Sequence, residues 1–107
     1  MSFVALQVAL SLIHSLRAPV GRIRRQHRKL ADQIVDSASS VAANLGEGNR
    51  RVGRDRLHFF RIAAGSAEET RVHLLVAQGW GWVSERDIDK PLELLDRQLR
   101  LLHGLTH

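Results

Sequence analysis

Apolar side chains recur at steps of three and four residues in four separate stretches of this chain, and that spacing is the period of an α-helix. From it we predict four helices, over residues 3–17, 22–45, 54–78 and 88–105. The alternating apolar and polar runs that would indicate strands are missing. Four helices with short connections predict an all-α fold, an antiparallel up-down-up-down four-helix bundle. A chain of 107 residues suits one such domain, over residues 1–107.

Proline and glycine predict where these helices break. Pro19 should end the first helix, because the residue before a proline avoids helical backbone angles. Glycine and asparagine favour the left-handed positions that stop a helix, and such residues follow the second and third helices: Gly46, Gly48 and Asn49, then Gly79 and Gly81. A proline deep in a helix disturbs it. Because of Pro91, we expect the fourth helix to begin near Asp89, after a turn over residues 84–88.

The apolar run over residues 3–16 could be a signal peptide, a membrane span or a core helix. It has no basic residues before it and no convincing cleavage site after it, as a signal peptide would require. It is also shorter than the roughly 20 apolar residues that a membrane span needs. We therefore expect a core helix and no membrane contact. Cysteine is absent, which suits a reducing, cytoplasmic location and excludes disulfides.

Positive charge is concentrated in two parts of the sequence. Lysine and arginine number 16 against 11 acidic residues, for a net charge of +5. Most of the basic residues are arginine, whose planar guanidinium suits phosphate. The candidate nucleic-acid-binding residues fall in segments 17–29 and 50–61: Arg22, Arg24, Arg25, Arg28 and Lys29, then Arg50, Arg51 and Arg54. The first segment is expected at the start of the second helix and the other past its far end. The two should therefore lie at opposite ends of the bundle.

The fourth helix carries more apolar residues than a single core stripe requires. Its second apolar line and two nearby tryptophans predict a subunit interface, made of Trp80, Trp82, Leu94, Leu101 and Leu105. The alternative is that all five fill a wide core within one chain. With only three phenylalanines and two tryptophans, the composition gives little support for nucleobases stacking on aromatic side chains.

No residue set in the sequence specifies a reaction, and we expect no enzyme activity and no cofactor. Arg22 and His27 fit the loose Arg-x4-His pattern of HEPN ribonucleases, but His27 also falls on the apolar stripe of the second helix. A partly buried structural histidine is the simpler interpretation. His103 and His107 have a metal-clip spacing without a third ligand, so no metal site is expected.

The central part of the chain carries a longer motif. QIVDSASSVAANLGEGNRR (residues 33–51) and FFRIAAGSAEETRVHLLVA (residues 59–77) resemble the bacterial four-helix bundle proteins encoded in 23S ribosomal RNA intervening sequences, once described as S23 ribosomal proteins. The accessory variability proteins of diversity-generating retroelements are related to them. Residues on motif positions are Asn44, Glu47, Gly48, Arg50, Gly65, Ser66 and Glu69. Val35 and Asp36 stand where the family has paired arginines.

The resemblance implies a four-helix bundle, a ring-like homopentamer and a bacterial cytosolic setting. For the retroelement members it implies a basic surface that contacts a reverse transcriptase and nucleic acid. The motif residues themselves are expected to be structural. Small side chains would let the second and third helices cross closely. Asn44 and Glu47 would hydrogen-bond backbone groups where the second helix ends, and Glu69 would pair with an arginine.

The sequence thus predicts a non-catalytic, self-associating bundle. Its expected partners are other copies of itself, RNA or DNA backbone, or a nucleic-acid-associated protein such as a reverse transcriptase. A purely structural interaction module is the alternative, and a HEPN-like ribonuclease is a third hypothesis.

Overall fold

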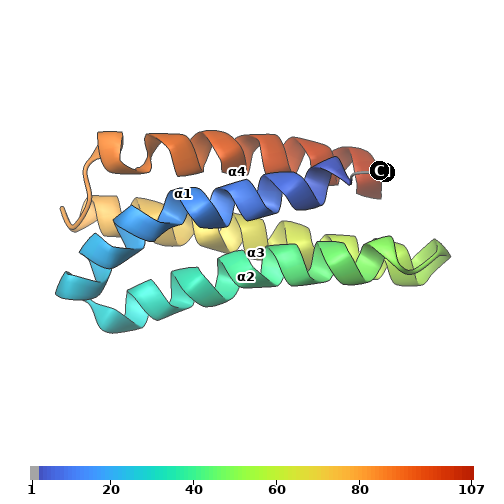
Figure 1. The fold of residues 1–107 in the computed structure, drawn as a ribbon, viewed down its shortest axis with the longest axis horizontal. Helices are drawn as coiled ribbons and strands as arrows, with labels where there is room; N and C mark the ends of the chain where they lie inside the picture. Colours follow the sequence, from blue (N-terminus) through green and yellow to red (C-terminus); the bar gives the residue numbers. More distant parts are fainter. Residues whose placement is uncertain (1–2) are drawn as a thin grey trace.

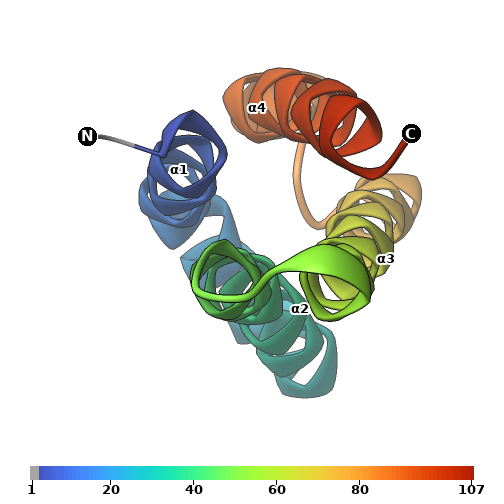
Figure 2. The same ribbon diagram turned by 90° about the vertical axis from the view of Figure 1, so that its right-hand side faces the viewer.

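The computed structural model describes residues 3–107, which form four helices. These are α1 (Val4–Gln26), α2 (Arg28–Asn49), α3 (Gly53–Gly79) and α4 (Glu85–Thr106). Consecutive helices run antiparallel, and α4 returns beside α1 to close the bundle, as Figures 1 and 2 show. The molecule is a rod of 43 × 22 × 22 Å. Since the described residues contain no strand, the predicted all-α four-helix bundle is confirmed.

The apolar stripes of the four helices meet in one core along the rod. Its largest fully buried apolar side chains come from every helix: Leu12, Ile23, Ile34, Leu45, Phe60, Leu74, Ile88, Leu95 and Leu102. The first helix supplies a full stripe of buried residues, as predicted for a core helix. By length and composition alone α1 could also cross a membrane, and 33% of its most apolar stretch is buried in the bundle.

The prediction that Pro19 ends the first helix is wrong, because α1 continues to Gln26. Proline inside a helix removes one backbone hydrogen bond and crowds the preceding turn. Here the ring of Pro19 is itself buried, and Ile23, one turn later, is fully buried. The burial of these two side chains offsets the local cost. Core packing therefore decides the length of this helix against its local backbone preference.

The first break comes at His27, whose extended backbone (φ −155°, ψ 97°) separates α1 from α2. Its Nδ1 accepts a hydrogen bond from the Leu30 backbone N–H at 3.0 Å and so caps α2. The side chain is exposed, so the predicted partly buried position is wrong, although its role here is structural. The predicted start of the second helix at Arg22 is wrong, because α2 begins at Arg28. Histidine is not among the usual capping residues, so the sequence did not mark His27 as a helix start.

The prediction that Gly46 and Gly48 stop the second helix is wrong, because α2 continues to Asn49. Neither Gly46 nor Gly48 has a positive φ angle. Gly48 instead permits a close approach, because a Cβ there would lie 2.6 Å from Cε1 of the buried Phe60 ring on α3. The left-handed glycine that follows α2 is Gly53, with φ +60°.

Small hydroxyl side chains also join α2 to α3, two to three turns before Gly48. The Ser37 and Thr70 hydroxyls lie 2.7 Å apart in the buried interior, and those of Ser40 and Ser66 lie 2.8 Å apart. Ser37 and Thr70 also hydrogen-bond to carbonyl oxygens of their own helices, so these buried hydroxyls are fully partnered. The predicted close packing of the second and third helices through small residues is therefore confirmed.

The last break combines a glycine turn with a capped helix start. Gly81, with φ +78°, follows α3, as predicted for a residue that stops a helix. The Ser84 hydroxyl then accepts a hydrogen bond from the Asp87 N–H, and the Asp87 carboxylate accepts one from the Ser84 N–H. This capping box starts α4 at Glu85. The predicted start near Asp89 is wrong, and the buried Pro91 lies inside the helix.

Candidate nucleic-acid interface

The first basic segment lies at the end of α1 and the start of α2, rather than only at the start of the second helix. Two of its arginines are paired: Arg22 with Asp87 of α4 at 2.7 Å, and Arg24 with Asp32 of α2. The other three predicted residues, Arg25, Arg28 and Lys29, are exposed, and no carboxylate among residues 3–107 lies within 4.0 Å of them. This end of the bundle therefore presents uncompensated positive charge.

The second basic segment joins α2 to α3. Arg51 is held by Glu47 at 3.4 Å and by Asp55 at 3.2 Å, and its guanidinium lies over the Phe59 ring. Arg50 and Arg54 are exposed and, within the part of the chain that the structure describes, have no carboxylate partner. This end too combines paired and unpaired arginines.

The two segments lie at opposite ends of the rod, as the sequence predicts. In Figure 1 the α1–α2 turn is at the left end and the α2–α3 connection is at the right end, where both chain termini also lie. The long dimension of the molecule is 43 Å, so one phosphate cannot contact both ends of one chain. Each end is consequently a separate site.

The apolar line predicted to be spare on the fourth helix is mostly used within the chain. Leu94 is buried, and Leu101 and Leu105 are half-buried against the core, as is Trp82. Among the five predicted interface residues only Trp80 stays largely exposed, at 70%. The leucines of α4 therefore pack mainly in the core of their own chain and leave little surface free for an interface.

Part of the apolar surface that remains free lies on α3, which sequence reasoning missed. Val72, Leu75 and Val76 are exposed on the side of the helix away from the buried Ala67 and Leu74. Apolar residues on two sides of α3 blur the periodicity that marks a single buried face. Which side of α3 is buried therefore becomes clear only from its packing against α2 and α4.

The motif residues have mostly structural roles. The Asn44 side chain donates to the Ser40 carbonyl oxygen at 2.9 Å, in the last turns of α2. Glu47 accepts from the Arg51 side chain rather than from a backbone group, and Glu69 pairs with His73 at 3.5 Å rather than with an arginine. The predictions for Glu47 and Glu69 are therefore wrong in partner. A Cβ on Gly65 would meet open space.

Arg22 and His27, the pair of the ribonuclease hypothesis, are engaged separately. The Arg22 guanidinium binds Asp87, and the His27 ring caps α2 and stacks on Trp82. In residues 3–107 there is no group of three or more His, Cys, Asp or Glu side chains placed to hold a metal ion.

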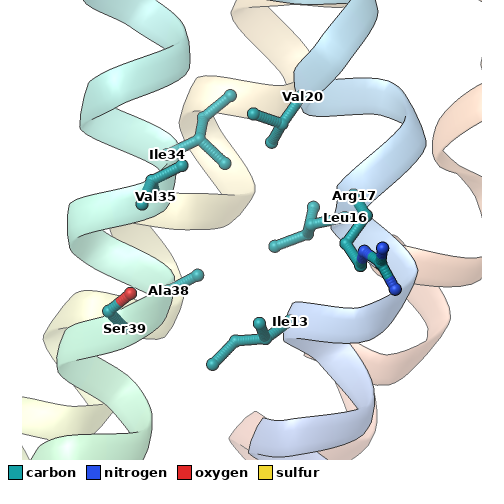
Figure 3. A pocket seen from close by; sticks show the side chains of 8 residues that line it. All are labelled: Ile13, Leu16, Arg17, Val20, Ile34, Val35, Ala38 and Ser39. Carbon is teal, nitrogen blue, oxygen red and sulfur yellow. The ribbon is translucent and has the colours of Figure 1, made fainter.

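A groove of about 330 Å³ opens between α1 and α2. Figure 3 shows Ile13, Leu16 and Val20 of α1 directed across it toward Ile34 and Ala38 of α2. Its lining is almost entirely apolar, with Arg17, Val35 and Ser39 completing it. Such a groove suits an apolar group and not a phosphate, so it lies outside the candidate interface.

Comparisons with known proteins identify the family. The sequence model of the family described as "23S rRNA-intervening sequence protein" matches residues 7–104, which is nearly the whole chain. The chain belongs to this family. The resemblance seen in the central motif is thereby confirmed. As a 23S rRNA-intervening sequence protein, the chain also has a structural relative, a protein of the S23 ribosomal protein family from Bacteroides thetaiotaomicron.

That crystal structure superposes with a TM-score of 0.83 at 18% sequence identity, over 95% of this chain and 97% of the other. At this identity the similarity establishes the shared fold alone. No curated protein sequence matches the chain.

Within this family member, Asp87 fixes the end of the bundle that carries the first basic segment. The backbone N–H of Ser84 donates to its carboxylate and, with the Ser84 hydroxyl and Arg22, lowers the pKa of Asp87 below its ordinary value, while desolvation acts in the opposite direction. A lowered carboxyl pKa means that the ionised form stabilises the fold. That contribution is complete above the unfolded-state pKa, near 4, and is lost as pH falls through the folded-state value.

Replacing Asp87 by asparagine is therefore expected to lower the Tm at pH 7 and to lower it less as the pH falls below about 4. Thermal unfolding followed by circular dichroism across this range measures the difference. The matched control is Asp89→Asn, which removes an exposed carboxylate of the same helix that forms no ion pair within residues 3–107. An Asp87→Asn deficit of equal size at pH 3 and pH 7 would contradict the assigned role.

Proposed function

We propose that this chain is a non-catalytic, self-associating four-helix bundle that binds the phosphate backbone of nucleic acids through its arginine-rich ends. The observation that carries the proposal is the set of exposed basic side chains without carboxylate partners at both ends of the rod: Arg25, Arg28, Lys29, Arg50 and Arg54. By contrast, Asp87 balances the charge of Arg22 at the first of these ends.

Backbone contact follows from the chemistry of these groups. An exposed guanidinium can bind a phosphate through two parallel hydrogen bonds, and it carries its charge at every physiological pH. Binding of this kind releases counterions from the nucleic acid, so it weakens with salt and does not depend on base sequence. The net charge of +5 adds long-range attraction for a polyanion.

Self-association is supported by the exposed apolar surface of α3. Val72 and Val76 lie on successive turns of its outer side, and they remain 49% and 42% exposed in one chain. Exposed apolar side chains that neighbour each other in this way are a feature of protein interfaces. The family resemblance favours a ring of five chains, and such a ring would display five copies of each basic end.

Charge-removal variants test the backbone proposal. We expect Arg25→Gln/Arg28→Gln and Arg50→Gln/Arg54→Gln each to weaken binding roughly tenfold at low salt, since each removes up to two phosphate contacts. Fluorescence anisotropy with labelled RNA and DNA oligonucleotides measures the affinity.

The control is Arg97→Gln/Arg100→Gln, which removes the same charge from exposed positions on α4, away from both basic segments. We expect this pair to change the affinity by less than about twofold. If all three double variants lost affinity equally, the binding would follow net charge alone, and the assignment to the two ends would be wrong.

A further inference from the structure

Both tryptophans lie at the end of the bundle that carries the first basic segment, where Trp82 stacks between His27 and Trp80. The Trp82 ring is 5.1 Å from the His27 ring, centroid to centroid, at an interplanar angle of 14°, and 5.9 Å from the Trp80 ring at 18°. Trp82 is half-buried, whereas Trp80 is 70% exposed. Trp80 therefore rests on Trp82 with one face and leaves most of its indole surface open to solvent.

The backbone holds this stack in place. After α3, the Trp82 N–H donates to the Ala77 carbonyl oxygen at 3.0 Å, and the Gly81 N–H donates to that of Gln78 at 2.9 Å. Together with the left-handed Gly81 (φ +78°), these bonds form a Schellman turn. The turn brings two indoles separated by a single residue into an offset stack, which is a preferred geometry for aromatic rings. The exposed ring is thus preorganised.

Three basic side chains lie next to this stack along the chain. His27 contacts Trp82 directly, and Arg25, Arg28 and Lys29 lie within two residues of His27 in the chain. The first turn of α2 contains no acidic residue to compensate them. Carboxylates at this end include Asp87, paired with Arg22, and Asp32, paired with Arg24, together with the exposed Glu85 and Asp89 of α4. Cations therefore adjoin the indoles on the side of the α1–α2 turn.

We propose that this end of the bundle binds single-stranded nucleic acid, with a base stacked on the open face of Trp80 and the adjoining phosphates on Arg25, Arg28 and Lys29. The inference rests on the proposed function and adds the strandedness of the ligand. An exposed aromatic ring beside a basic surface is the arrangement that binds unpaired bases without sequence preference. Bases in a duplex are stacked on each other and do not reach such a ring.

The other end of the bundle lacks this feature. The guanidinium of Arg51 lies 5.2 Å from the centre of the Phe59 ring, and that of Arg56 lies 5.1 Å from the centre of the buried Phe60 ring. These aromatic faces are already occupied. That end therefore contacts phosphates alone and binds single strands and duplexes similarly.

The test compares Trp80→Ala with the unaltered chain, using oligouridylate and oligothymidylate of about a dozen nucleotides. We expect the variant to bind both about tenfold more weakly, the loss that corresponds to one stacked base. Binding should quench the tryptophan fluorescence of the unaltered chain. An abasic oligonucleotide of equal charge should bind the unaltered chain as weakly as the oligonucleotides bind the variant, and Trp80→Phe should retain most of the affinity.

Val52→Ala is the matched control, because it trims an apolar side chain that is 83% exposed at the other end of the bundle. If Trp80→Ala and the abasic strand left a salt-sensitive affinity unchanged, the stacking proposal would be overturned while phosphate binding stood. A change in oligomeric mass without loss of affinity would also overturn it, since Trp80 would then belong to a subunit interface. Failure of every oligonucleotide to bind at low salt would contradict both the stacking proposal and the proposed phosphate binding.

Discussion

Replacing Gly48 by alanine is expected to lower the free energy of unfolding by about 1–3 kcal/mol, the usual cost of overpacking a core. In most helices the same change is stabilising, because glycine costs about 1 kcal/mol relative to alanine. At this position the new Cβ would lie 2.6 Å from Cε1 and 2.7 Å from Cδ1 of Phe60, and 3.1 Å from Cβ of Phe59. The Phe60 ring is fully buried, so relieving this overlap requires the ring or the two helices to shift within the packed core.

Gly46→Ala is the internal control for that prediction. Gly46 lies two residues earlier in the same helix, and a Cβ there would meet no atom within 4 Å. We expect this change to stabilise the protein by about 0.5–1 kcal/mol, from helix propensity alone. Urea unfolding of the two variants gives opposite signs if the α2–α3 crossing is as close as described. Stabilisation by both changes would show that the crossing is looser.

Introducing aspartate at both Val72 and Val76 is expected to convert the assembly into 12.0 kDa monomers. For a ring of five such chains, the unaltered protein should have a mass of about 60 kDa. The carboxylates would have to be buried without partners between subunits, which is far more costly than exposing them on a single chain. Light scattering at micromolar concentration measures both masses, and circular dichroism establishes that the variant remains helical.

A second pair of exposed apolar residues supplies the control for this variant. Val4 and Leu10 on α1 are 44% and 54% exposed, close to the values for the α3 pair, and their replacement by aspartate changes the charge equally. This control is expected to keep the mass of the unaltered protein. If the unaltered chain is itself a monomer, the self-association proposal is wrong.

The sequence alone was sufficient to predict the number of helices, their antiparallel order and the buried side of the last three helices, because helical periodicity reports on burial. For the first helix the periodicity favoured Leu6, Leu10 and Ile13, whereas the buried residues include Ala5, Leu12 and Leu16.

The sequence placed the helix ends less well. Pro19 and Pro91 lie inside helices because their own rings pack in the core. Gly48 lies inside α2, where the absence of a side chain lets the Phe60 ring of α3 pack against the backbone. In each case a contact with a distant part of the chain overrides the local backbone preference, and such a contact leaves no local pattern.

The candidate site, too, was predicted only where it depends on local sequence. Charge clustering placed the basic segments at opposite ends, and the structure agrees. The ion pair between Arg22 and Asp87, which removes Arg22 from the uncompensated residues, joins positions 65 apart in the chain and could not be foreseen. The stack of His27 on Trp82 likewise depends on how α1 and α3 end beside each other. The small number of phenylalanines and tryptophans gave little support for bases stacking on aromatic side chains.

The central claim, that both arginine-rich ends bind nucleic-acid backbone, is tested most directly by a salt titration of oligonucleotide binding. The logarithm of the binding constant of the unaltered chain should fall linearly with the logarithm of salt concentration. Replacing Arg25, Arg28, Arg50 and Arg54 together by glutamine should make that slope shallower by about one for each phosphate that is no longer neutralised. No binding at low salt, or a slope that the four replacements leave unchanged, would contradict the claim.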